Sequence, residues 1–257
     1  MKLWTINTHS LLENDYERKL KIFVHTVSVK KPDIIAMQEV NQPHISDNVT
    51  VNENNHVCRA AKLLEDKGIK YYWHWLPLKL GYDKYDEGLA VMSRTRITET
   101  DELLISGTSD YANWKTRKIL GVKTEGSNDW FYTVHMGWWN DKEEPFKEQW
   151  ERLKKHINGK GRVWLMGDFN SRQDVRGEGY DLVTSSGFYD TYLLAKEKDS
   201  GITVGGSIDG WTERKMDKAR IDYIFCSEKT DIQSSMVIFN NMNYSVISDH
   251  YGLENNL

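Results

Sequence analysis

The chain has 257 residues, of which 39% are hydrophobic and 28% are charged, and its formal net charge at pH 7 is −4. These proportions exclude a disordered chain, and four prolines leave no room for a proline-rich linker. The negative charge disfavours a protein that holds long nucleic acid on a basic surface, because phosphate backbones are bound by clusters of Lys and Arg. Length and composition predict one α/β domain over residues 1–257.

The two cysteines and the N-terminal segment bear on location. Cys226 ends an apolar run that predicts a buried strand, so a disulfide between it and Cys58 is not expected. The first residues enter a strand-like pattern without a basic region followed by a long apolar stretch. We therefore expect no signal peptide, no membrane span and a cytoplasmic location. No pattern in the sequence specifies an oligomeric state.

Strand-like and helix-like segments alternate in the first part of the chain. Leu20, Phe23 and Val27 have the spacing of one buried helix face, whereas shorter apolar runs predict strands. The expected elements are a strand at Lys2–Asn7, a helix at Asp15–Lys30, a strand at Asp33–Glu39, a helix at Asn55–Asp66 and a strand at Tyr71–Leu76.

The second part mixes strands and helices in the same way, so no separate domain is indicated. Long loops are expected at Lys79–Glu87 and Gly107–Lys115, and a glycine-containing loop at Thr203–Lys218. The remaining expected elements are strands at Gly88–Arg94, Arg117–Lys123 and Trp130–His135, a helix at Glu144–His156, a strand at Arg162–Asp168, a helix-rich stretch at Tyr180–Lys196, and strands at Arg220–Cys226 and Ser235–Asn240.

Polar residues follow several of these apolar strands directly. Asn7, Glu39 and Asp168 stand at predicted strand ends, where α/β enzymes present side chains to a shared cleft. A carboxylate such as Glu39 is a suitable ligand for Mg²⁺, which prefers oxygen donors. Each residue alone is better explained by a helix cap or a turn, so the hypothesis of a site depends on their combination.

Two further patterns suggest chemistry. Asp168 and Asn170 stand two positions apart at a turn, suited to orienting a water and holding a phosphoryl oxygen, or simply to forming an Asx-turn. Asp222 lies inside an apolar strand and needs a partner there. His250 would be that partner if the carboxylate orients an imidazole, whereas Arg220 or Arg117 would be if the pair is only structural.

A series of short motifs in chain order resembles the endonuclease/exonuclease/phosphatase superfamily. The motifs run over nearly the whole chain, from residue 3 to residue 252. They are Asn7, Gln38–Glu39, Glu87–Gly88, Val134–His135, Gly167–Asn170, Arg220–Tyr223 and Ser248–His250.

This resemblance implies a four-layer α/β/β/α sandwich of the deoxyribonuclease I-like type, with the active site where strand ends converge. It also implies a role for each matching position. Asn7, Glu39 and Asp249 would hold the metal, Asp168 and Asn170 would position water and phosphoryl group, Asp222 would orient His250, and His135 paired with Glu87 would be a second acid–base histidine. Mg²⁺ is the expected cofactor, and Mn²⁺ would suit the same oxygen ligands.

A finer resemblance, to bacterial maltose 6'-phosphate phosphatases, lies in the segments 81–88, 110–118, 135–141 and 208–211. Tryptophans in or beside these segments offer flat apolar faces to a sugar ring, although packing would explain them equally well. The expected substrate-binding residues are Trp114, Trp138, Trp139, Trp211 and Arg117, with Lys84 a weaker candidate than Arg117 for the phosphate.

The sequence therefore predicts a metal-dependent phosphomonoesterase that hydrolyses a small phosphorylated sugar by in-line attack of water. The alternative within the same fold is a phosphodiesterase, either a nuclease or a sphingomyelinase-like enzyme. The net charge disfavours nucleic acid, and no exposed apolar hairpin that would seat the enzyme on a membrane is evident. A non-catalytic binding module is a third alternative, and the complete set of candidate residues argues against it.

Overall fold

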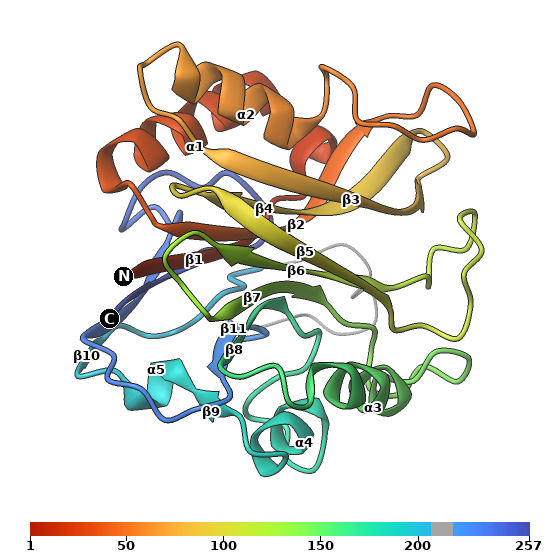
Figure 1. The fold of residues 1–257 in the computed structure, drawn as a ribbon, viewed down its shortest axis with the longest axis vertical. Helices are drawn as coiled ribbons and strands as arrows, with labels where there is room; N and C mark the ends of the chain where they lie inside the picture. The colour runs from red at the N-terminus through yellow and green to blue at the C-terminus, as the bar shows by residue number, and fades with distance from the viewer. Residues whose placement is uncertain (207–217) are drawn as a thin grey trace.

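The central strands carry apolar side chains on both faces, so each sheet must be covered on two sides. In β2 (Ile34–Pro43), Ile34 and Ala36 join one buried cluster whereas Ile35 and Met37 join another, because successive side chains of a strand point in opposite directions. The computed structural model describes residues 1–206 and 218–257. They form four layers, in the order helix, sheet, sheet, helix (Figure 1), which confirms the predicted sandwich.

The first sheet, sheet A, has seven strands in the described residues, and β1 and β2 lie near its centre as parallel neighbours. Its order is β10 (Glu197–Lys198), β12 (Ser234–Ile238), β13 (Gly252–Asn256), β1 (Lys2–Asn7), β2, β4 (Tyr85–Ser93) and β3 (Tyr72–Gly81).

The second sheet, sheet B, has six strands in the same part of the chain, with β7 and β8 parallel at its centre. Its order is β5 (Ile97–Leu104), β6 (Lys118–Thr124), β7 (Trp130–His135), β8 (Val163–Asp168), β11 (Asp222–Cys226) and β9 (Tyr189–Asp190).

Three buried clusters fill the spaces between the layers. The cluster between the two sheets joins residues such as Leu3 and Val91 of sheet A to Phe131 and Trp164 of sheet B. Two outer clusters cover sheet A with α1 (Tyr16–Lys30) and α2 (His56–Glu65), and sheet B with α3 (Phe146–Ile157) and α4 (Gly179–Ser185). The remaining short helices are η1 (Ser10–Leu12) and α5 (Thr191–Leu194).

Several predicted boundaries were wrong. The segment expected to be a long loop at Lys79–Glu87 instead continues β3 to Gly81 and begins β4 at Tyr85, so only a short turn connects the two strands. The polar strands β5 and β13 were not predicted. The stretch Tyr180–Lys196 contains α4 and α5 separated by the short strand β9.

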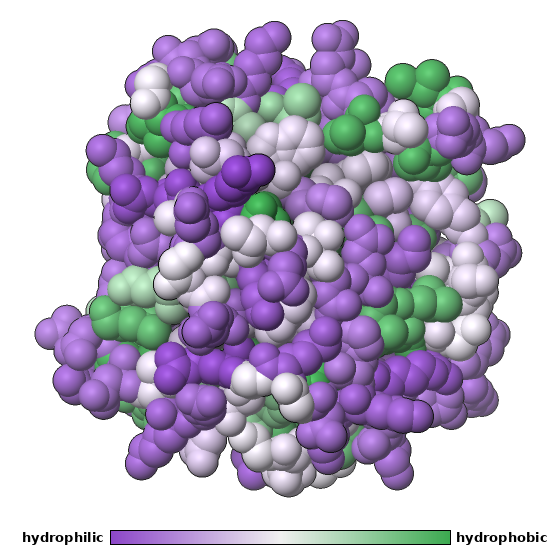
Figure 2. Space-filling view, in the orientation of Figure 1, coloured by the Kyte–Doolittle hydropathy of each residue, from purple (hydrophilic) through white to green (hydrophobic). Residues whose placement is uncertain are grey.

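The surface of the face seen in Figure 1 is mostly hydrophilic, with apolar residues in small separate groups (Figure 2). Among the described residues, no helix has both the length and the apolar character needed to cross a bilayer.

Arg220, just before β11, is buried and pairs with Asp190 rather than with Asp222. Its Nη2 atom lies 2.8 Å from Asp190 Oδ2, and its guanidinium also lies over the rings of Tyr192 and Tyr223. Arg220 therefore anchors the start of β11 to β9, and Asp222 is left to interact elsewhere. This excludes the alternative in which Asp222 serves as the ion-pair partner of Arg220.

We predict that Asp190→Asn will lower the free energy of unfolding by about 3–5 kcal/mol, because the Arg220 charge would remain buried without a carboxylate. Asparagine can still accept the helix-capping bond from Tyr192 N that Asp190 now accepts, so the variant changes only the other oxygen, Oδ2, which contacts Arg220 and accepts from the Tyr180 hydroxyl. Urea denaturation measures the change. Glu228→Gln, which removes the exposed partner of Arg162, should cost less than about 1 kcal/mol; equal losses in the two variants would contradict the prediction.

Candidate active site

Strand direction and register bring polar residues from both sheets to one edge of the sandwich. β1 runs parallel to β2 and ends at Asn7, opposite Gln38, whereas β7 runs parallel to β8 and pairs His135 with Asp168. β11 runs antiparallel to β8 and begins at this edge, which places Asp222 opposite Asp168. The strand ends singled out in the sequence therefore meet in space.

A β-bulge in β2 directs Glu39 toward this edge. The register between β2 and β4 shifts between Met37 and Val40, and Glu39 has a φ of 51° within the strand. Bulges re-aim side chains next to functional sites, and a positive φ is a conformation that non-glycine residues rarely adopt. Glu39 is thus held in a strained conformation that an ordinary strand residue would avoid.

Gly167 permits the close approach of β7 and β8. Its φ is 153°, and a Cβ at this position would lie 1.9 Å from the carbonyl oxygen of Val134. Only glycine fits there, and the pairing of the next residues, His135 with Asp168, depends on that contact.

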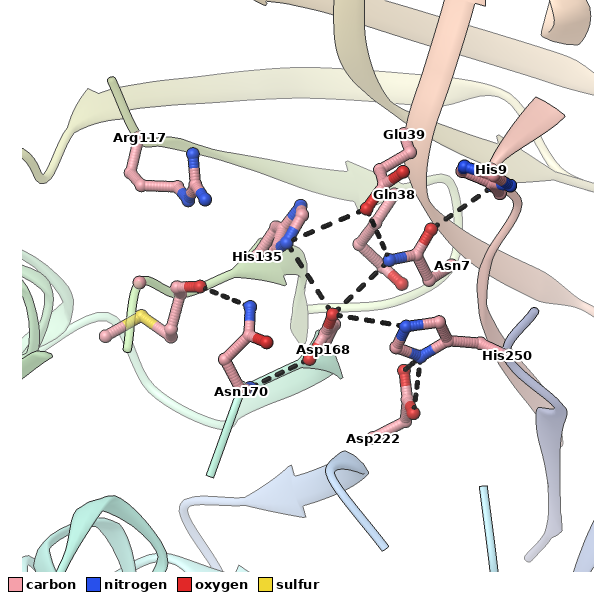
Figure 3. A network of polar contacts seen from close by, with 12 residues as sticks. Asn7, His9, Gln38, Glu39, Arg117, His135, Asp168, Asn170, Asp222 and His250 are labelled. Carbon is pink, nitrogen blue, oxygen red and sulfur yellow. Dashed lines mark hydrogen bonds and ion pairs between the residues drawn. The ribbon is translucent and has the colours of Figure 1, made fainter. Parts of the chain in front are cut away.

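The side chains of Asn7, Glu39 and Asp168 form the centre of the site (Figure 3). Asn7 Nδ2 donates to Glu39 Oε1 at 2.8 Å and to Asp168 Oδ2 at 3.3 Å. His135 Nε2 lies 3.6 Å from the same oxygen of Asp168. One amide thus connects a carboxylate of sheet A to a carboxylate of sheet B.

The turn after β8 fixes the orientation of Asp168. Asp168 Oδ1 accepts from the backbone N–H of Asn170 at 2.8 Å, and Asn170 Nδ2 donates to the carbonyl of Met136 at 2.9 Å. The Asx-turn considered for this sequence is therefore present. Because the turn engages Oδ1, it leaves Oδ2 directed at Asn7 and the two histidines.

His250 and Asp222 form the pair expected from the sequence. His250 Nδ1 lies 3.0 Å from Asp222 Oδ2, and its Nε2 lies 3.8 Å from Asp168 Oδ2. Burial alone would lower the pKa of His250, but the charges of Asp222 and Asp168 outweigh it and raise that pKa well above its usual value.

The remaining groups of the site are perturbed in the directions their surroundings require. Burial raises the pKa of Asp168 to about 7, with a further contribution from Asp222. Burial and the charge of Glu87 raise the pKa of Glu39, whereas burial, Arg117 and Lys79 hold the pKa of His135 well below its usual value. Perturbed groups gathered in one cleft are typical of active sites.

Asp249 lines the same cleft but is engaged differently from Glu39. Its carboxylate lies 3.9 Å from His9 Nδ1, and His9 in turn bonds Glu13 Oε1 at 2.8 Å. Burial would lower the pKa of His9, but the hydrogen bond to Glu13 and the charge of Glu39 raise it to about 9. Of the three predicted metal ligands, Asn7 and Glu39 therefore contact each other, whereas Asp249 belongs to a neighbouring group with His9 and Glu13.

The cleft has a volume of about 780 Å³, enough for a ligand of disaccharide size. Its lining includes carboxylates, both site histidines, two buried cations and two tryptophans. The lining residues that the sequence had singled out are Glu39, Glu87, Trp114, Arg117, His135, Trp138, Asp168, Asn170, Asp249 and His250.

The tryptophans differ in position. Trp114 is 50% exposed, and its ring centroid lies 5.4 Å from that of Trp138, so the two rings form a wall of the cleft. Trp139 instead packs against Phe146 and lines an adjoining hollow of about 150 Å³. Trp211 lies outside the described residues.

Glu87 does not contact His135, contrary to the expected pairing. Its Oε1 lies 3.2 Å from Lys79 Nζ, and both side chains are buried. Arg117 is also buried and has no carboxylate partner at contact distance among the described residues; its Nη1 donates to the carbonyls of Trp114 and Thr116. The surface carboxylate considered for Arg117 is therefore not its partner.

Sequence reasoning missed several residues of the cleft. Lys79, Tyr82, Asn140 and Asp141 line it, and the cluster of His9 with Glu13 borders it. The sequence contains a signal for Lys79, which stands between two leucines in a strand-like run. A buried lysine there needs an anionic partner, by the same reasoning that applies to Asp222 in its apolar strand. Lys84, the weaker phosphate candidate, is exposed and does not line the cleft.

The donor set at the centre of the site fits a hard divalent cation. Glu39 Oε1 and Asp168 Oδ2 both contact the same amide group, and both carboxyl groups have raised pKa values that a nearby cation would lower. Carboxylate oxygens are ligands that Mg²⁺ prefers. Asn7 turns its Nδ2 toward these carboxylates, and its Oδ1 accepts from the backbone N–H of His9 at 3.2 Å, so Asn7 would need a rotation of its amide to offer oxygen to the cation.

Fold and site together define a deoxyribonuclease I-like phosphoester hydrolase, a four-layer sandwich with carboxylates and histidines at one edge. The model of the endonuclease/exonuclease/phosphatase family matches residues 4–250. The chain belongs to this family, whose members hydrolyse phosphoesters and generally depend on divalent metals. A search of curated proteins finds no match.

Solved structures agree with this assignment. A family member from Leptotrichia buccalis is 34% identical with a TM-score of 0.90, and the match covers 100% of this chain and 98% of that one. A mannosyl-6-phosphatase from Bacteroides thetaiotaomicron is 20% identical with a TM-score of 0.67 (100% and 98% covered). A 3' phosphatase from Neisseria bound to a product DNA hairpin is 17% identical with a TM-score of 0.66 (100% and 99% covered). The last two show a shared fold.

Proposed function

We propose that the protein is a Mg²⁺-dependent phosphomonoesterase that hydrolyses a small phosphorylated sugar. The observation that carries the proposal is the wall formed by Trp114 and Trp138 in the same cleft as Asp168 and His250. Flat aromatic faces suit the C–H faces of a sugar ring, whereas a polynucleotide would call for a basic surface that the net charge of −4 disfavours. The mannosyl-6-phosphatase among the structural neighbours accords with this substrate class.

In this proposal each polar residue has a defined task. Asp168 Oδ2, held by the turn at Asn170, orients the attacking water, and Asn170 holds a phosphoryl oxygen. His250, held by Asp222, and His135 perform the acid–base work from the two sides of Asp168. A positioned general acid contributes roughly 10²- to 10⁴-fold, which matters because a sugar alkoxide is a poor leaving group. Arg117 binds the phosphate.

Asn7, Glu39 and Asp249 would hold the metal ion. When bound, it would neutralise charge on the phosphoryl group, a contribution that the slow hydrolysis of phosphate monoesters requires, since they need accelerations of up to about 10²¹-fold.

A substrate panel tests the function. Phosphorylated mono- and disaccharides, nucleotides, plasmid DNA and sphingomyelin would be compared with and without Mg²⁺. We expect the highest kcat/KM for a sugar phosphate and no turnover in EDTA. A preference for DNA or sphingomyelin would identify a phosphodiesterase instead, and inactivity on every substrate would support a binding module.

We predict that Glu39→Ala will lower activity by about 100-fold or more through weaker Mg²⁺ binding, since even residues that only orient metal ligands contribute 10- to 100-fold. Calorimetric titration with Mg²⁺ measures the binding separately from turnover. Glu143→Ala removes a carboxylate that is 74% exposed and serves as the control. Unchanged Mg²⁺ affinity in Glu39→Ala would refute the assignment.

We predict that Asp222→Asn will lower kcat by about 100-fold or more with a smaller effect on KM, because an amide can bond His250 but cannot stabilise an imidazolium. The measurement is a pH–rate profile of both enzymes. Asp190→Asn, a buried carboxyl group on the neighbouring strand, should lose stability without this loss of turnover. An unchanged profile would count against the role of the pair.

We predict that Trp138→Ala will lower kcat/KM for a disaccharide phosphate about tenfold, because a ring contact that buries about 60 Å² contributes roughly 1.5 kcal/mol. Hydrolysis of glycerol phosphate, which has no sugar ring to stack on Trp138, should change less than about threefold. Trp139→Ala is the control, since Trp139 packs on Phe146 outside the cleft. Equal losses on both substrates would mean that Trp138 only packs the site.

A further inference from the structure

Lys79 is a buried cation in the cleft with no part in the chemistry described above. It is 6% exposed, and its Nζ lies 3.2 Å from Glu87 Oε1 and 2.9 Å from the carbonyl oxygen of Trp114. An ammonium has three N–H donors, so these two contacts leave one that faces the cleft Lys79 lines.

Arg117 meets Lys79 at one atom. Its Nη1 donates to the same Trp114 carbonyl oxygen at 2.9 Å, so one oxygen holds two positive charges side by side. Its Nε is buried and has no hydrogen-bond partner among the described residues. Two adjacent buried cations repel each other, and burial together with Arg117 lowers the pKa of Lys79.

Glu87 makes direct contact with only one of the two cations, although its charge, with those of Glu39 and Asp168, also acts on Arg117 from a greater distance. It pairs with Lys79, whereas the neighbours that Arg117 contacts are carbonyl groups. A buried guanidinium without a carboxylate costs several kcal/mol, which an anion bound in the cleft would offset. Figure 3 shows Arg117 beyond His135, on the side away from His250, so the cationic pair lies past the centre of the site.

We propose that Lys79 and Arg117 form an anion subsite for the unesterified oxygens of a phosphate monoester, and that Lys79 selects monoesters over diesters. The inference rests on the proposed function and specifies its substrate class. A monoester carries about −1.5 to −2 charge and three acceptor oxygens at pH 7. A diester carries one charge and only two unesterified oxygens, because the third is bonded to carbon and no longer offers a charged acceptor to this subsite.

Binding of two small anions tests the subsite without turnover. Calorimetry in the presence of Mg²⁺ would compare inorganic phosphate with dimethyl phosphate. Lys79→Met should weaken phosphate binding about 10- to 100-fold, the range of one charge-assisted hydrogen bond, and dimethyl phosphate binding less than about threefold. Lys84→Met, which removes an exposed lysine outside the cleft, should change neither.

Lys79→Met leaves Glu87 buried without its partner and could unfold the protein for that reason alone. The double variant Lys79→Met/Glu87→Gln removes both charges together and should give the same loss of phosphate affinity in a folded protein, as checked by thermal unfolding. Equal weakening of both anions, or unchanged phosphate affinity, in that variant would overturn the proposal.

The same proteins separate this inference from the proposed function. A wild-type enzyme that turns over only diesters would refute the monoesterase. Loss of selective phosphate binding in the Lys79 variants would still establish the subsite. A wild-type monoesterase whose Lys79 variants keep their preference for phosphate would refute the subsite alone.

Discussion

The centre of the site depends on the amide group of Asn7, which bonds carboxylates of both sheets. Asn7 Nδ2 bonds Glu39 of sheet A and Asp168 of sheet B, and Nε2 of His135 and of His250 lie 3.6 Å and 3.8 Å from the same Asp168 oxygen. Two buried carboxylates with raised pKa values repel each other, so the amide donor between them reduces a repulsion that would otherwise favour separating the sheets at this edge. A divalent cation would be held most strongly where these two carboxylates approach each other.

Around that contact, strained backbone conformations occur at residues that orient side chains toward the cleft. Positive φ angles occur at Glu39 and Asn170, and each residue turns a side chain toward a position that regular strand geometry would not reach. The Asx-turn that engages Asp168 Oδ1 is an ordinary local structure, yet it decides which oxygen faces the cleft. The local turn and the pairing of distant strands therefore act together to orient the side chains of the site.

The sequence predicted the sandwich and most strands of the site, because those strands are continuous apolar runs that end abruptly in polar residues. It missed β13, a central strand rich in polar residues, since the main partners of Glu254 there are Trp4 Nε1 and Lys30 Nζ, which are far away in the chain. The same limit explains Glu87: a motif can locate a carboxylate at a strand, but its partner, Lys79, is set by the pairing of β3 with β4. Contacts between distant segments leave no local pattern.

The pairing of β1 with β13 has a consequence for how the molecule assembles. Lys2 lies opposite Asn256, and the loop that carries Asp249 and His250 directly precedes β13, so the centre of sheet A joins segments that are far apart in the sequence, such as Trp4 and Glu254, 250 positions apart. The two distant segments must come together before their contacts can form, and this loss of chain entropy makes folding slow. On the ribosome, β1 and β2 would have to wait with one edge unpaired, a state prone to aggregation. Chains that terminate before Asp249 would lack both the strand that seals this edge and His250, so such incomplete synthesis products would be inactive as well as unstable.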